Sequence, residues 1–348
     1  MKRKIKKSIH SGEAVKENAG RNKKKIGKIL GIIGIALVAV IAVYTVLVLF
    51  GNSIFHQAFF AKAETGSEIP GLTDGFTPQG VTTLEGSDET LICGYMPGSE
   101  NSRIYRVSAD GTVTEIRLLL EDGTAYTGHA GGFTAAGQYI YISNASKLFV
   151  LNTADVLNAT DGGTVQFVGR IEVPCRASFC SSDGEMLYVG EYHAVGYTTE
   201  ESHKVDSKDG ILAAMVFAYR LSEDGIFGIA DTEIPEKIFA TCDNVQGFAM
   251  LPGETAMLSC SAGIASSSLR FYQAGGSADS IFPYKGKSVP LFVLDSDREI
   301  RTEKAPHMSE DLEYRNGKVY IGFEAGAQKF GGGLLPCTVK NVMMLQIE

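Results

Sequence analysis

The sequence predicts an all-β domain built from repeated four-stranded units and preceded by one transmembrane α-helix. Three observations lead to this fold class. Residues 29–50 are apolar and carry no charge. After residue 75 the helical period gives way to short alternating or β-branched runs separated by Gly, Asp and Asn turns, which is typical of strands. These runs then recur as five similar units along the rest of the chain.

Charge is divided unevenly along the chain. Residues 1–28 hold eleven Lys or Arg but only two acidic residues, Glu13 and Glu17, so this tail carries a net charge of +9. Because the whole chain of 348 residues carries −8, the remaining 320 residues carry −17. Such asymmetry indicates two compartments or two partners. The acidic body would repel a phosphate backbone, so we expect no nucleic-acid partner for it.

The uncharged segment is long enough to cross a membrane. As a helix, its 22 residues extend about 33 Å, against a hydrocarbon core of roughly 30 Å. Four lysines precede the segment, and flanks rich in Lys or Arg stay in the cytoplasm; they are Lys23, Lys24, Lys25 and Lys28. We therefore expect a single-pass cell-membrane protein with a basic cytoplasmic tail (residues 1–28), a transmembrane helix (29–50) and an extracytoplasmic C-terminal domain.

A cleaved signal peptide is the alternative interpretation of this N-terminus. Ala61-Lys62-Ala63 resembles a small-residue cleavage site. However, the apolar segment is longer than the roughly 7–15 residues of a signal peptide, and bulky Phe55, Phe59 and Phe60 lie between it and this site. These features favour an uncleaved anchor.

The five units share one order of elements. Each begins with a small residue and a short apolar strand, continues through a turn into a strongly apolar strand, and adds further strands. The units start at residues 80, 132, 178, 247 and 311, which are 46 to 69 residues apart. Four short strands at this spacing match the blades of a β-propeller, where each small sheet buries its faces against neighbouring blades. We predict a propeller of about five blades over residues 76–348.

Closure of the ring leaves alternatives. The fifth unit ends the chain on its third strand, so we expect its outer strand from residues 69–76, at the end of a stalk over residues 51–75. In the fourth unit, residues 291–297 (LFVLDSD) are expected to supply a strand after an insertion. A sixth blade is the alternative if residues 226–241 or 268–284 form a further sheet.

The unit pattern, such as GVTTLEG, TLICGYM and RIYRVSADG in the first unit, resembles extracytoplasmic bacterial β-propellers. It is similar to the gluconolactonase class and related repeat propellers, over roughly residues 70–348. The absence of Trp argues against the Trp-Asp repeat class. The calcium-and-acid set of the lactonase class has no counterpart at matching positions. The resemblance therefore implies a fold and not an activity, and we expect no resident cofactor, with Ca²⁺ as the alternative.

Six cysteines lie in the predicted outer domain: Cys93, Cys175, Cys180, Cys242, Cys260 and Cys337. In an oxidising compartment they permit three disulfides in fifteen pairings, among which the sequence does not choose. Cys93 and Cys260 fall at matching places in the second strands of their units, which favours buried free thiols. No CxxC or His-rich spacing indicates zinc, so no metal site is predicted.

The residues just before each first strand are the main candidate site. Propellers usually bind ligands at one mouth of the central channel, where such residues converge. Polar groups recur at this position in all five units: Gln79, His129, Arg176, Gln246 and Glu310. Convergent polar groups on a rigid scaffold are typical of a ligand site. The alternative is a channel lined by polar side chains simply because it holds water.

A second candidate group follows the second strands. It contains Glu191, His193 and Glu324, with Tyr95, Tyr192 and Tyr197 nearby in the repeat. Glu191 and His193 are alternate residues and are expected on one strand face, where a carboxylate and an imidazole could act as acid and base or bind a metal. A solvated loop is the other interpretation.

These observations support two functions. The first is a membrane-tethered binding or scaffolding module for an envelope glycan, peptide or protein. The alternative is an envelope hydrolase or lyase that uses His129 with Glu310 or Glu324, with or without a divalent cation. No nucleophile elbow, phosphate loop or dinucleotide glycine fingerprint stands in a suitable context.

Overall fold

The computed structural model describes residues 2–84 and 86–347, with side chains from Arg21 on, and the chain divides into two units, Met1–Gly51 and Asn52–Glu348. Helix α1 (Lys2–Phe55) forms the first unit and enters the second. Its segment Arg21–Phe55 is long and apolar enough to span a membrane, with no part of the tested window buried. The same properties suit a membrane anchor or a signal sequence, so the fold itself does not decide the orientation.

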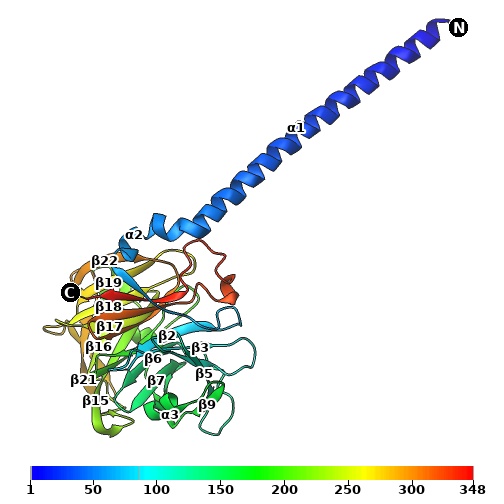
Figure 1. Ribbon diagram of the computed structural model, residues 1–348. Coiled ribbons are helices and arrows are strands. Elements are labelled where there is room, and N and C mark those ends of the chain that lie inside the picture. Colours follow the sequence, from blue (N-terminus) through cyan, green and yellow to red (C-terminus); the bar gives the residue numbers. More distant parts are fainter. Residues whose placement is uncertain (1, 85, 348) are drawn as a thin grey trace. The chain divides into compact units, whose positions relative to one another are not determined.

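The second unit is a propeller of five blades, each a sheet of four antiparallel strands that run in order from the channel outwards (Figure 1). Blade 1 contains β2 (Thr77–Thr83), β3 (Thr90–Tyr95), β4 (Arg103–Val107) and β5 (Val113–Leu119). Blade 2 contains β6 (Gly132–Ala136), β7 (Tyr139–Asn144), β8 (Lys147–Asn152) and β10 (Gly169–Glu172). Blade 3 contains β11 (Ala177–Ser182), β12 (Met186–Glu191), β15 (Ala214–Ile226) and β16 (Lys237–Thr241). Blade 4 contains β17 (Val245–Leu251), β18 (Thr255–Cys260), β19 (Ser267–Gln273) and β22 (Glu299–Ala305).

The two ends of the second unit meet in blade 5. Its strands are β23 (Ser309–Arg315), β24 (Lys318–Phe323), β25 (Asn341–Gln346) and β1 (Ala63–Glu68). The outer strand therefore comes from the N-terminal side, but from residues 63–68 and not from residues 69–76. Those residues form turns instead, and they place the side chains of Ile69, Leu72 and Phe76 in the core.

Two blades gain extra strands at their outer edges. β9 (Gly163–Gln166) pairs in parallel with β5, and β21 (Lys287–Val293) pairs in parallel with β16 and carries β20 (Ser280–Tyr284). In the sequence, each extension comes between the third and fourth strands of the following blade. In the structure, it pairs instead with the outer strand of the preceding blade. The expectation that residues 291–297 form a strand of the fourth blade is therefore wrong. The third strand of that blade is β19, inside the segment that the sequence analysis treated as an insertion.

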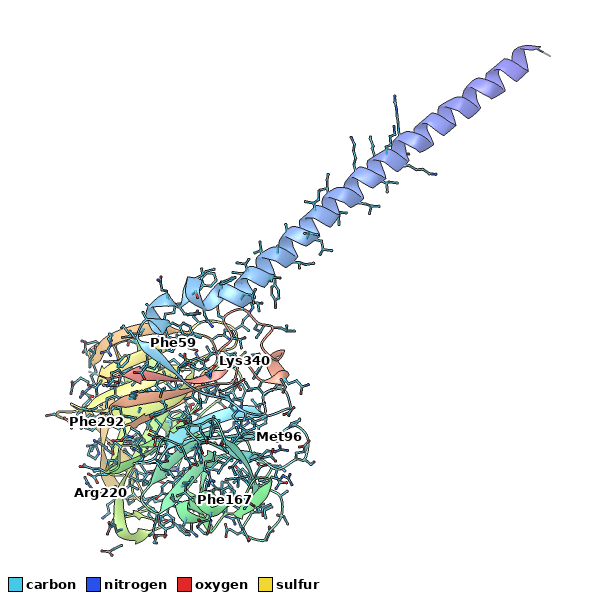
Figure 2. The ribbon with its side chains drawn as sticks, in the orientation of Figure 1. Phe59, Met96, Phe167, Arg220, Phe292 and Lys340 are labelled. Carbon is cyan, nitrogen blue, oxygen red and sulfur yellow. The ribbon has the colours of Figure 1, made fainter. Side chains whose placement is uncertain are left out.

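The core consists of five hydrophobic clusters, one between each pair of adjacent blades. Phe167, Phe292 and Phe59 belong to three different clusters, and Figure 2 shows them in separate parts of the propeller. The cluster of Ile69, Leu72 and Phe76 fills the interface of blades 5 and 1. Five interfaces for five blades are what a closed ring requires, because an open one would leave two apolar faces exposed.

The first strands line the channel and contact one another around the ring, in the order β2, β6, β11, β17, β23 and again β2. Turns of two or three residues connect them to the second strands in blades 2 to 5. Asn316 and Gly317 join β23 to β24 with φ of 53° and 79°, as a two-residue turn with both φ positive requires. Each first strand thus begins at the end of the propeller where the second strand of its blade ends.

Candidate functional site

At that end of the propeller lies a cavity of about 490 Å³, lined by residues from all five blades. We call it the mouth cavity. Four of the five predicted mouth residues and one secondary candidate line it: Gln79, His129, Arg176, Gln246 and Glu324. Tyr95, Tyr192 and Tyr197 line it as well. The structure therefore brings together side chains that are spread over more than 200 residues of sequence, because the same two positions recur in each blade.

Glu310, the fifth predicted mouth residue, lies beneath the cavity and is only 3% exposed. Its Oε1 accepts a hydrogen bond from Gln246 Nε2 at 3.2 Å, and its carboxyl group is hydrogen-bonded to that of Glu324. Glu324 Oε2 in turn accepts a bond from Gln79 Nε2 at 2.9 Å. Burial, together with the neighbouring carboxylate, raises the pKa of Glu310 well above its usual value, and burial raises that of Glu324. Both effects favour the protonated form of this carboxyl pair.

Two cations reach the mouth cavity. Lys329 donates a hydrogen bond to the Tyr95 hydroxyl. Burial opposes its charge, but this bond and the two nearby carboxylates raise its pKa overall. The Arg176 side chain is exposed and makes no ion pair or hydrogen bond with any residue described in the structure. Arg176 is therefore free to pair with a ligand.

His129 is neutral in this environment. Its ring stacks on Tyr95, with centroids 4.5 Å apart and planes at 26°. Burial, and then the charge of Lys329, lowers the pKa of His129 to about 4. Within residues 2–84 and 86–347, no hydrogen bond or ion pair joins its ring to Glu310 or Glu324. An acid–base pair of His129 with either carboxylate is therefore not formed here.

Glu191 and His193 do not form a joint site. Strand β12 ends at Glu191, which is buried and accepts bonds from His203 Nδ1 at 2.7 Å and from the Met215 backbone N–H at 3.2 Å. His193 lies beyond the strand, and its Nδ1 is 2.7 Å from Asp243 Oδ1. The expectation that the two act from one strand face is wrong, because β12 ends at Glu191 and each of the two side chains has a separate partner.

The sequence analysis missed four polar residues of the mouth cavity: Asn144, Ser178, Ser261 and Lys329. Asn144 ends the second strand of blade 2, the position that Tyr95 and Glu324 occupy or follow in their own blades, so the repeat register was a usable signal for it. Lys329 belongs to a short 3-10 helix, Gln328–Phe330, in the long connection between β24 and β25. No periodic signal marks that position.

Below the mouth, the buried strand β23 carries two more acidic residues along the channel. Asp311 Oδ2 accepts the Phe133 backbone N–H at 2.9 Å. Glu313 Oε1 accepts bonds from the hydroxyls of Thr82 at 3.0 Å and Thr134 at 2.8 Å. Burial raises the pKa of Glu313 to about 7 and that of Asp311 well above its usual value. Among the described residues, no group of three or more His, Cys, Asp or Glu side chains is arranged to hold a metal ion.

These shifts predict how stability depends on pH. A carboxyl group with a raised pKa binds its proton more tightly in the folded state, so the stability from Glu313 is lost as pH rises from 4.5 through about 7. Burial lowers the pKa values of His56 and His129 from 6.5 to about 4. The stability that these two neutral histidines contribute is therefore lost as pH falls from 6.5 to about 4. The two effects oppose each other between pH 4.5 and 6.5, and above 6.5 the effect of these histidines ends while that of the carboxyl groups continues.

We therefore expect the Tm of the full chain in detergent, followed by far-UV circular dichroism, to be lower at about pH 8 than at about pH 6. Glu310→Gln should reduce this difference, because an amide resembles the protonated acid and has no proton to lose. A Tm that is flat or rises over this range in the unsubstituted protein would contradict the prediction.

Comparisons with known proteins show no family for this chain. No family model matches it, and no curated protein does. A PQQ-bound aldose sugar dehydrogenase from Streptomyces coelicolor aligns at 14% identity and a TM-score of 0.40, over 82% of this chain and 97% of that one. A GH43 β-xylosidase/α-arabinofuranosidase from a compost microbial metagenome gives 12% and 0.41, over 80% and 93%. The hydrazine synthase of Kuenenia stuttgartiensis gives 13% and 0.36, over 74% of this chain but only 57% of that one.

Likeness at this level transfers no activity, substrate or cofactor to this chain. The assignment to the β-propeller class rests on the sheet topology, and the function has to be argued from the mouth cavity.

Proposed function

We propose that the protein is a membrane-tethered, extracytoplasmic binding module whose mouth cavity holds an envelope glycan that carries an anionic group. The observation that carries this proposal is the convergence of polar and aromatic side chains from all five blades on one cavity. The apolar helix and its lysine-rich flank support the tether and the outward orientation. Peptides and other envelope proteins are the competing ligands.

The chemistry of the cavity suits a sugar. Tyr192 and Tyr197 form an edge-on pair with centroids 5.6 Å apart, and Tyr197 is 58% exposed, so its ring is accessible to a ligand. Aromatic faces pack against the apolar faces of sugars, and the amides of Gln79, Gln246 and Asn144 can donate to and accept from hydroxyl groups.

The charge of the cavity indicates an anionic group on that sugar. Arg176 and Lys329 supply two positive charges, whereas the raised pKa values of Glu310 and Glu324 weaken the opposing negative charge and His129 is neutral. The mouth is thus locally cationic within a strongly acidic body. A carboxylate accepts two parallel bonds from a guanidinium group, which makes Arg176 the best-placed anchor.

The hydrolase alternative has less support from this geometry. Glycosidases hold two carboxyl groups roughly 5–9.5 Å apart on either side of the scissile bond. Glu310 and Glu324 instead hydrogen-bond to each other, and Gln79 and Gln246 occupy their outer oxygens. The two carboxyl groups thus form a hydrogen-bonded pair at the base of the cavity, and they are not spaced as an acid and a nucleophile.

Binding of a galacturonic acid trisaccharide to the full chain in detergent, measured by titration calorimetry, tests the proposal. Arg176→Gln is expected to weaken binding by roughly 10- to 100-fold, since a hydrogen-bonded charged group contributes about 1.5–3 kcal/mol. The control Arg117→Gln changes an exposed arginine of blade 1 outside the cavity and should leave the affinity unchanged. The uncharged galactose trisaccharide should bind more weakly than the acid. Equal affinities for the two sugars, or an Arg176→Gln variant that binds normally, would count against the proposal.

A further inference from the structure

Two thiols meet at the junction of blades 3 and 4. Cys242 directly follows β16, the fourth strand of blade 3, and Cys260 ends β18, the second strand of blade 4. Their Sγ atoms are 3.7 Å apart. Cys260 is buried and Cys242 is partly exposed, so one thiol of the pair is open to a reagent from solvent.

The surroundings of the pair differ from those of the other thiols. Cys93 and Cys180 are fully buried, and their Sγ atoms are directed at backbone carbonyl oxygens, those of Ala130 and Tyr141. Both Cys242 and Cys260 instead feel the guanidinium charge of Arg270, which lies on β19 next to β18. The Nε atom of Arg270 is buried and has no partner among the described residues. A cation beside a thiol stabilises the thiolate, which is the reactive form.

The hydrogen bond between the two thiols assigns their roles. The bond from Cys260, and then Arg270, lowers the pKa of Cys242 despite burial, whereas the same bond and burial raise the pKa of Cys260 well above its usual value. Cys242, which is also the more exposed of the two, is therefore the thiol placed to react first, with Cys260 behind it. An accessible thiolate with a second thiol behind it is typical of cysteines that respond to oxidants.

We propose that Cys242 and Cys260 are a redox-active pair that forms a disulfide joining blades 3 and 4 when it meets a disulfide oxidant. The thiolate of Cys242 attacks one sulfur of the oxidant and releases the other as a thiolate, leaving a mixed disulfide. Cys260 then loses its proton and attacks the Sγ atom of Cys242, and the second half of the oxidant leaves as a thiolate. The two cysteines together lose two electrons and two protons, and the oxidant is reduced to two thiols.

The disulfide would fix a wall of the mouth cavity. Between Cys242 and the next strand, Asn244 Oδ1 accepts a bond from the Tyr192 hydroxyl at 3.3 Å, and its backbone oxygen accepts one from Ser261 N–H at 2.8 Å. Tyr192 and Ser261 both line the mouth cavity. Oxidation of the pair therefore constrains the segment that positions these two residues.

Peptide mapping of the full chain tests the proposal directly. The reduced protein in detergent is incubated with oxidised glutathione, quenched with N-ethylmaleimide and digested without reduction for mass spectrometry. We expect one cross-linked peptide pair, joining the segment with Cys242 to that with Cys260, and no cross-link to the remaining four cysteines. Protein that keeps its circular dichroism spectrum while both thiols are recovered as N-ethylmaleimide adducts would overturn the proposal.

Two variants test the assigned roles. In Cys260→Ala, Cys242 should end as a stable glutathione adduct, and its reaction with N-ethylmaleimide at neutral pH should slow by several-fold because its hydrogen-bond donor is removed. Cys337→Ser, which changes a cysteine outside the pair, should form the cross-link as the unsubstituted protein does. An unchanged rate in Cys260→Ala would overturn the assignment of Cys242 as the attacking thiol.

Discussion

Replacing Arg315 with alanine is expected to lower the free energy of unfolding by roughly 3–5 kcal/mol, the usual cost of removing one partner of a buried ion pair. Arg315 ends β23 and donates from Nη1 to the Ser182 carbonyl at 2.6 Å and from Nη2 to the Ala135 carbonyl at 2.5 Å. Its Nη2 also lies 2.9 Å from Glu313 Oε1. One side chain of blade 5 thus contacts blades 2 and 3 across the channel.

The loss of stability is large because the buried carboxyl group of Glu313 would be left without its cationic partner. This carboxyl group has no exposed surface, and the positive charge of Arg315 is what limits the rise of its pKa. Without Arg315 it would have to bind a proton at neutral pH, and the two carbonyl groups would lose their donor. Leaving such groups unpaired in a buried place costs more than the bond itself contributes.

Urea denaturation of the full chain in detergent measures this effect, followed by circular dichroism because the chain has no tryptophan for fluorescence. Arg117→Ala is the matched control. Arg117 pairs with Glu115 at 3.3 Å on the surface of blade 1, where an ion pair contributes at most about 1 kcal/mol. If the two alanine variants differ by less than about 1 kcal/mol, the channel contacts are not the stabilising element that we infer.

The parts of the fold that could be predicted from the sequence are those that depend on local patterns of residues. The apolar helix and the repeated strand–turn–strand order need only neighbouring residues, so five blades could be counted. The mouth residues followed from the same repeat, because Gln79 and Gln246 hold the same bulged position in their first strands and Arg176 directly precedes the first strand of blade 3. A periodic scaffold carries a local register into three dimensions without further information.

What sequence reasoning missed depends on pairing between distant segments. Strand β1 joins β25 across almost the whole chain, and no feature of residues 63–68 marks them as its partner. β21 has the apolar pattern of a blade strand but pairs at the edge of the preceding blade. The sequence did not indicate that Glu191 is buried and hydrogen-bonded to His203, which lies in a separate 3-10 segment. Local patterns indicate that a strand or a charged residue is present, but they do not identify the strand or side chain with which it pairs.

Substituting Gly132 with alanine is expected to have a comparably severe effect, for a steric reason. A Cβ atom on Gly132 would lie 2.2 Å from the backbone nitrogen of Cys180 and 2.5 Å from the Cα atom of Phe179, both on β11 of the next blade. These are backbone atoms inside a paired strand, so they cannot rotate away as a side chain would. We expect a loss of at least about 3 kcal/mol, or failure to fold, because adding atoms to a packed core typically costs 1–3 kcal/mol even where side chains can adjust.

Gly322→Ala is the control that separates this close approach from a general intolerance of substituted strand glycines. Gly322 lies in β24, and the nearest atom to its added Cβ is Val81 Cγ1 at 3.8 Å, an ordinary contact. Its urea midpoint should stay near that of the unsubstituted protein. Gly80 approaches blade 2 as closely as Gly132 approaches blade 3, with a Cβ placed 2.4 Å from Phe133, so Gly80→Ala should resemble Gly132→Ala. The prediction is contradicted if Gly132→Ala unfolds at the same urea concentration as Gly322→Ala. In that case the first strands do not depend on backbone-to-backbone packing, and this packing is not what brings the mouth residues together.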